Sequence, residues 1–94
     1  MLIRQKRYQL SSDYLLREIA GEGVLVPIGR APGNTMTTLN KTSVFLFRLL
    51  ETPHTVEEII ALAQQRYNDP SGVLDAQIRE FISNHLQTGK LKEA

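Results

Sequence analysis

The chain has 94 residues, of which 41% are hydrophobic and 22% charged, and its formal net charge is +1. This length fits one domain, because domains usually hold about 100–200 residues, and the composition is that of a globular protein. The absence of cysteine excludes a disulfide scaffold, a thiolate zinc site, an iron–sulfur cluster and a thiol nucleophile. No apolar run approaches the ~18 residues of a membrane span, and the basic N-terminus lacks the apolar stretch of a signal peptide. We therefore expect a cytoplasmic protein that makes no membrane contact.

The first forty residues have the pattern of β-strands. Tyr14–Ala20 and Val24–Ile28 flank Gly21-Glu22-Gly23, which predicts a tight antiparallel hairpin with a type II′ turn. Pro27 cannot donate to a ladder, so we place it at the end of its strand, where pairing has stopped. After a loop rich in glycine and proline, Thr35–Leu39 predicts a third short strand.

The remainder predicts helices. Asn40 is a good N-cap for a first helix over Lys41–Glu51. This helix is apolar around most of its circumference, which marks it as a buried central element with Phe45 in the core. Thr55 and Glu58 form a capping box for a second helix, which we expect to end near residue 68.

A third helix is predicted from about Val73 to Thr88, with Gly89 as its C′ residue. Three strands followed by three helices indicate an α+β domain with a winged helix-turn-helix-like bundle. His85 lies on the apolar stripe of this helix, and His54 lies in a turn. We interpret them as a half-buried, hydrogen-bonded histidine and a solvated one, because a zinc site needs three or four ligands.

No catalytic constellation or cofactor motif is found, so we expect no enzymatic activity, no cofactor and no metal. DNA binding through the third helix is one alternative, but among its charged residues only Arg79 is a cation, against Asp75 and Glu80. The strand over residues 35–39 is another candidate, since an edge strand can capture an extended peptide. The same strand could instead be blunted by its shortness or covered by a helix, as in a purely structural interaction subunit. The residues alone leave these interpretations open.

Several segments in a fixed order resemble the pyrroloquinoline quinone synthesis protein D (PqqD-like) family. The resemblance covers roughly residues 14–91 and is carried by Leu15–Glu22, Val24–Pro27, Thr38–Thr42, Phe45–Leu50, Thr55–Ile59, Arg66-Tyr67, and Ile78 with Phe81-Ile82 and Gly89. The chain departs from the family pattern at Phe47, where tryptophan is frequent, and at His85 and Lys90, where apolar residues are frequent.

The resemblance implies a single peptide-recognition domain over residues 1–94, with a lead-in at 1–13, strands at 14–39 and helices at 40–91. Such domains bind the leader segment of a ribosomally made precursor peptide, which adds as a strand beside the third strand and lies against the third helix. They deliver it to a maturation enzyme, often a radical S-adenosylmethionine enzyme. On this basis the expected peptide-binding residues are Thr35, Met36, Thr37, Thr38, Leu39, Ile78, Phe81 and His85.

Overall fold

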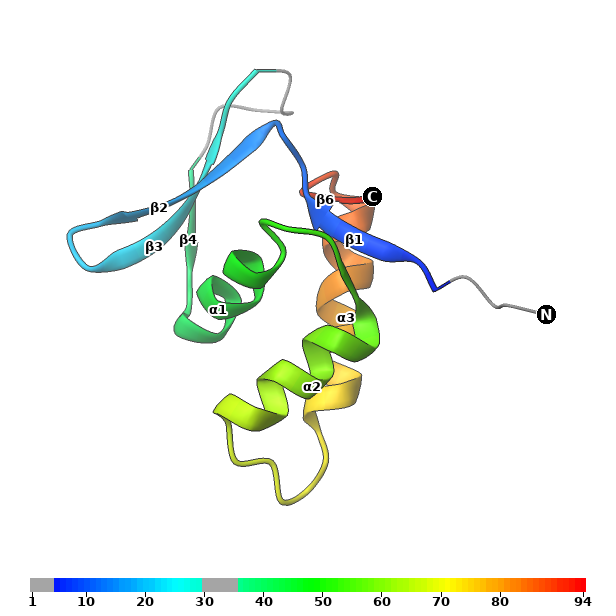
Figure 1. Ribbon diagram of the computed structural model, residues 1–94. Helices are drawn as coiled ribbons and strands as arrows, with labels where there is room; N and C mark the ends of the chain where they lie inside the picture. Colours follow the sequence, from blue (N-terminus) through cyan, green and yellow to red (C-terminus); the bar gives the residue numbers. More distant parts are fainter. Residues whose placement is uncertain (1–4, 30–35) are drawn as a thin grey trace.

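The computed structural model describes residues 5–29 and 36–94, and in these ranges it shows two small antiparallel sheets and three helices (Figure 1). The strands are β1 (Arg7–Leu10), β2 (Tyr14–Ile19), β3 (Glu22–Pro27), β4 (Thr37–Leu39), β5 (His54–Thr55) and β6 (Leu91–Glu93). The helices are α1 (Lys41–Leu49), α2 (Val56–Arg66) and α3 (Leu74–Gln87). The predicted α+β class is confirmed.

The first sheet has the strand order β2-β3-β4. Strands β2 and β3 form a hairpin whose last pair is Ile19↔Glu22, which leaves Ala20 and Gly21 as a two-residue loop. Both loop residues have positive φ, 53° and 80°, and this is the geometry of a type I′ turn. The predicted type II′ turn, placed one residue further along the chain, is wrong, because Gly23 is a paired strand residue.

Pro27 is the last residue of β3, as predicted, but it still lies opposite Tyr14 of β2, so the expectation that pairing has stopped there is wrong. Strand β4 pairs only with Gly23, Val24 and Leu25, so the proline lies beyond the three-stranded part of the sheet. The predicted start of the third strand, Thr35, lies outside the described residues, as does most of the loop before it.

The second sheet, with order β5-β1-β6, was not predicted. The lead-in forms its central strand, β1, which pairs with β6 from the C-terminal end and with β5 between α1 and α2. His54 is therefore half-buried in β5 opposite Tyr8, and not a fully solvated turn residue. Strands of two and three residues are too short for an alternating pattern to reveal them.

The predicted helix caps are confirmed. The Asn40 side chain accepts from the Ser43 backbone N–H at 2.7 Å. Thr55 and Glu58 make both hydrogen bonds of the capping box, at 3.1 and 2.8 Å. Gly89 has a φ of 80° directly after α3. Each helix ends one or two residues before its expected limit, because fraying ends leave no sequence signal of their own.

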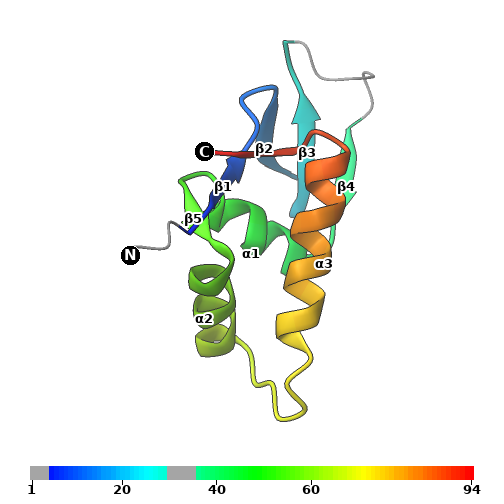
Figure 2. The same cartoon turned by 90° about the vertical axis from the view of Figure 1, so that its right-hand side faces the viewer.

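Helix α1 contacts all three strands of the first sheet on one side and α2 on another, and α2 packs against α3 (Figures 1 and 2). The largest fully buried side chains are Phe47, Leu25, Leu50, Ile59 and Ile78. The core phenylalanine of α1 is therefore Phe47. Phe45 is only partly buried and meets the Tyr67 ring edge-on at 5.6 Å, which corrects its predicted place in the core.

Candidate functional site

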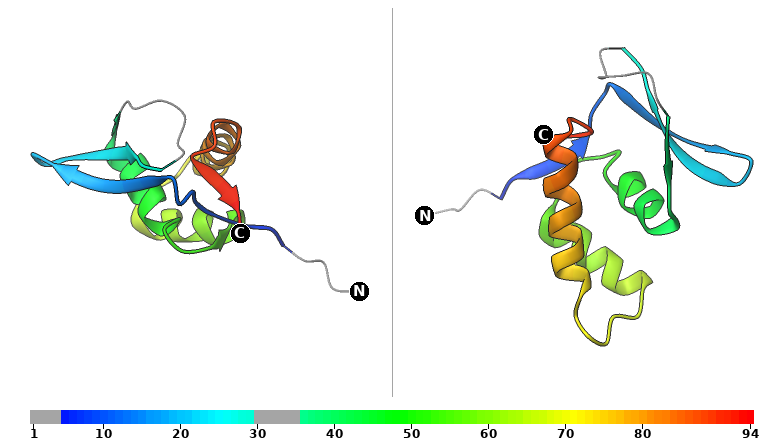
Figure 3. Two further views of the ribbon diagram at one scale, coloured as in Figure 1. Left: turned by 90° about the horizontal axis from the view of Figure 1, so that it is seen from above. Right: turned by 180° about the vertical axis from the view of Figure 1, so that it is seen from behind.

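Strand β4 is one edge of the β2-β3-β4 sheet, and no described strand pairs with its far side. Seen from behind, β4 and α3 stand on either side of α1 (Figure 3). The predicted site residues of these two elements that remain accessible are called here the β4–α3 surface. It takes Met36 and Thr38 from the β4 side and Phe81 and His85 from α3.

The hydrogen-bond phase of the sheet identifies which backbone groups of β4 are unpaired. The Ile28 N–H donates to the Asp13 carbonyl at 2.7 Å, directly beyond the last residue pair of β2 and β3, Tyr14 and Pro27. Hydrogen-bonded and non-bonded pairs alternate along an antiparallel ladder, so every second residue of β3, including Gly23 and Leu25, directs its N–H and C=O toward β4. Their partners on β4 are Leu39 and Thr37.

Thr38, between these two partners, directs its backbone N–H and C=O to the free edge of the sheet. None of the described residues hydrogen-bonds to either group. The same alternation turns the Thr38 side chain to the face of the sheet opposite the fully buried Leu25. Thr38 therefore offers one donor and one acceptor to an added strand.

The opposite edge, β2, is longer but better protected. By the same alternation of hydrogen-bonded pairs, Tyr14 and Leu16 direct their backbone N–H and C=O groups away from β3. The Tyr14 N–H donates to the Ser11 carbonyl at 3.1 Å. The Leu16 carbonyl accepts from the Arg17 guanidinium at 3.2 Å. Proteins commonly protect edge strands with such charged side chains and local turns, so β4 is the more open of the two edges.

An aromatic cluster forms the α3 side of the β4–α3 surface. The Phe81 and His85 rings lie 4.5 Å apart, and each lies 4.9 Å from the Phe47 ring of α1. Phe47 is fully buried, whereas Phe81 and His85 are half-buried. The α3 wall of the surface is therefore apolar and ring-lined, and it rests on the core.

His85 differs from its interpretation as a hydrogen-bonded histidine. Its Nδ1 is buried and has no hydrogen-bond partner among the described residues. Burial lowers the pKa of His85, and the nearby Lys90 ammonium lowers it further. The neutral imidazole is thus favoured, with one nitrogen unsatisfied.

Most of the predicted site residues that the structure describes are exposed or half-buried. Met36 is 54% exposed, Thr37 and Thr38 are exposed, and Leu39 is half-buried. Ile78 is only 2% exposed and belongs to the hydrophobic core, which removes it from the accessible surface. Thr35 is not among the described residues.

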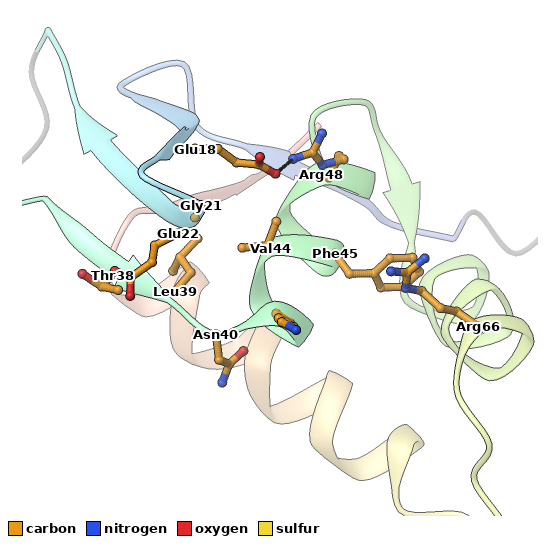
Figure 4. A pocket seen from close by; sticks show the side chains of 12 residues that line it. Glu18, Gly21, Glu22, Thr38, Leu39, Asn40, Val44, Phe45, Arg48 and Arg66 are labelled. Carbon is orange, nitrogen blue, oxygen red and sulfur yellow. Dashed lines mark hydrogen bonds and ion pairs between the residues drawn. The ribbon is translucent and has the colours of Figure 1, made fainter.

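A second feature, which sequence reasoning missed, is a cleft of about 680 Å³ between the β2–β3 hairpin and α1 (Figure 4). This hairpin–α1 cleft is lined on its helix side by Lys41, Val44, Phe45 and Arg48 of α1 and by Arg66 of α2. The four α1 residues share one face by 3–4 spacing. That spacing is a signal in the sequence, but the hairpin that closes the cleft is not evident without the fold.

Within residues 5–29 and 36–94, no group of three or more histidine, aspartate or glutamate residues is placed to hold a metal ion. No helix in these ranges is long and apolar enough to cross a membrane. On α3, Arg79 is engaged by Asp75 at 2.6 Å and by Glu57 at 3.8 Å. The cation expected to contact DNA phosphates is thus already paired with carboxylates.

Comparison with known proteins bears on the family and the fold of the chain. The search of curated proteins gave no match. Among solved structures, the fold is similar to that of "TbiB1 in Complex with the TbiA(beta) Leader Peptide", with a TM-score of 0.73 and 20% sequence identity over 89% of this chain and 94% of that one. The family model described as coenzyme PQQ synthesis protein D (PqqD) matches residues 22–89, more than half of the chain. The chain therefore belongs to the PqqD family.

Proposed function

We propose that this protein is a non-catalytic recognition module that binds the leader segment of a ribosomally synthesised precursor peptide. The leader adds as a strand to β4 and lies against Phe81 and His85 of α3. The module then presents the bound precursor to a maturation enzyme, for which a radical S-adenosylmethionine enzyme is the class that the sequence resemblance implies. Membership of the PqqD family and the similar fold of a protein solved with a leader peptide support this role.

The observation that carries the proposal is the unpaired backbone of Thr38 at the free edge of β4. One residue supplies only two backbone hydrogen bonds, each worth about 0.5–1.5 kcal/mol net. Ordering a flexible peptide costs more than this. Apolar contacts with Phe81, and with the ring of His85, must therefore supply most of the affinity.

The strand geometry also determines the pattern of the ligand. Successive side chains of an added strand point to opposite faces, so only alternate residues of the leader reach α3. We expect two apolar residues spaced i and i+2 as the anchors. A polar group between them, or on one of them, could satisfy the buried Nδ1 of His85.

A selection from a displayed library of random peptides tests the proposal. The enriched peptides are expected to show the i, i+2 apolar spacing. Titrated into the ¹⁵N-labelled protein, they should shift the amide signals of Thr38, Phe81 and His85. Enriched peptides that shift only signals of β1, β5 and β6 would place peptide capture at the other sheet and contradict the proposal.

A further inference from the structure

Apart from Thr38 and Leu39, the residues that line the hairpin–α1 cleft have no part in the proposed function. The helix side of the cleft rises from one face of α1, whereas Phe47, which supports the aromatic cluster, projects from a different face of the same helix. No residue of α3 lines the cleft. Thr38 and Leu39 of β4 do line it, so a ligand in the cleft and a peptide added to β4 would meet at these two residues.

The base of the cleft is apolar, and its back is closed where Gly23 of β3 packs directly against the Val44 side chain. Phe45 and Leu39 extend this apolar base toward α2 and β4. Pockets of about 300–1,000 Å³ with such a lining are of the size that holds one or a few apolar groups. Gly21, at the hairpin tip, has no atoms within 4 Å of its Cβ position, so the entrance is open on that side.

The cationic side chains on the helix side of the cleft differ in whether a carboxylate pairs with them. The Arg48 guanidinium pairs with Glu18 at 3.1 Å and is neutralised (Figure 4). The Arg66 guanidinium lies 5.1 Å from the centre of the Phe45 ring, a cation–π arrangement that holds it at the cleft and leaves its charge uncompensated. Lys41 and Arg66 make no ion pair with any described residue, and neither does Glu22 on the hairpin side, so the lining carries three cations against two carboxylates.

We propose that the hairpin–α1 cleft is a docking site for a segment of a partner protein in which apolar side chains are flanked by carboxylates. The apolar side chains occupy the base beside Val44 and Phe45. The flanking carboxylates pair with Lys41 at the start of α1 and with Arg66 at the end of α2. This charge complementarity selects an acidic segment and disfavours a basic one.

Two synthetic probes of opposite charge test this site in the full chain at low salt. The first is acetyl-Asp-Glu-Leu-Phe-Asp-Glu-amide, and the second carries lysine at each of the four acidic positions. The acidic probe is expected to shift the amide signals of Gly21, Gly23, Lys41 and Val44. It should bind about tenfold more tightly than the basic probe, since two exposed ion pairs contribute roughly that factor.

Matched charge reversals separate a specific site from a general charge effect. The double variant Lys41→Glu/Arg66→Glu should reverse the preference between the probes. The variant Lys6→Glu/Lys92→Glu changes the net charge equally at positions outside the cleft and should keep the preference. Equal binding of both probes, the same reversal in both variants, or shifts at Phe81 and His85 in place of the cleft signals would overturn the proposal. Neither probe is a leader peptide, so failure of leader binding would leave this result unaffected.

Discussion

Gly23 of β3 and Val44 of α1 pack backbone against side chain, without room for a β-carbon between them. A Cβ built on Gly23 would overlap Val44 Cγ2. Gly23 pairs with Leu39 of β4 on the same face of the sheet as the buried Leu25. This contact therefore sets how closely the three-stranded sheet approaches α1.

Replacing Gly23 by alanine should destabilise the protein by about 1–3 kcal/mol, the usual effect of overpacking a tight contact. Chemical denaturation monitored by circular dichroism measures the change in unfolding free energy. The double variant Gly23→Ala/Val44→Ala should recover part of the loss, because the smaller side chain at position 44 leaves space for the new methyl group. Additive effects of the two substitutions would mean that the two residues do not interact in this way.

Phe47→Ala should cost about 3–5 kcal/mol, the range for a buried phenylalanine, which is a large fraction of the total stability of a small domain. Phe45→Ala should cost distinctly less, because Phe45 is only partly buried. Thermal melts of the two variants under identical conditions give the comparison. Equal losses would contradict the assignment of Phe47 as the central side chain of α1.

The parts of the fold that could be predicted are those specified by local chemistry. Asn40, Thr55 and Glu58 cap helices through contacts within one turn, so their types and spacing are sufficient. The β5-β1-β6 sheet could not be predicted, because its pairs join residues such as Tyr8 and Glu93 from opposite ends of the chain. The hairpin turn lies one residue before its predicted position, because Ala20 adopts a positive φ that its residue type disfavours.

Most of the predicted site residues within the described ranges are exposed or half-buried, whereas Ile78 is buried in the core. The third strand was identified from its threonines, but the pairing register that makes Thr38 the outward residue depends on β2 and β3. Ile78, Phe81 and His85 lie on one stripe of α3, and the sequence gives no means to divide the stripe into core and surface. Three-dimensional packing buries Ile78 and leaves the other two partly accessible.

Thr55→Ala should destabilise the protein by about 1 kcal/mol, because the Glu58 N–H loses its acceptor at the start of α2. Thr55→Ser keeps the hydroxyl group and is the matched control, which should retain most of the capping contribution. Urea denaturation of the three proteins gives both differences. If serine and alanine were equally destabilising, the lost methyl group of this buried residue, and not the cap, would be responsible.

His85 should make stability depend on pH. Burial lowers its pKa in the folded protein below the ordinary value of 6.5, so the unfolded chain binds more protons in the acidic range. Stability then rises with pH: the contribution is complete above about pH 6.5 and is lost as the pH falls through the lowered pKa. Urea denaturation between pH 5 and pH 8 measures this slope, and His85→Leu should flatten it. An unchanged slope in the variant would assign the pH dependence to other groups.

The free edge of β4 gives the sharpest test of strand addition. Thr38 directs its N–H outward, whereas Thr37 directs its N–H to β3. Thr38→Pro should therefore remove a donor needed only by an added strand and leave the ladder with β3 intact. Thr37→Pro should break the ladder itself and lower the unfolding free energy further, because proline is tolerated only where no ladder donor is required.

Circular dichroism reports the fold of both variants, and titration with a peptide enriched from the library reports binding. Thr38→Pro is expected to keep the wild-type spectrum and to lose peptide affinity, whereas the control Thr38→Ala, which keeps the backbone N–H, should bind almost as the wild type does. A folded Thr38→Pro variant with unchanged affinity would show that the peptide does not pair with this edge. Equal losses from Thr38→Ala and Thr38→Pro would instead assign the contact to the threonine side chain, since only proline removes the backbone donor.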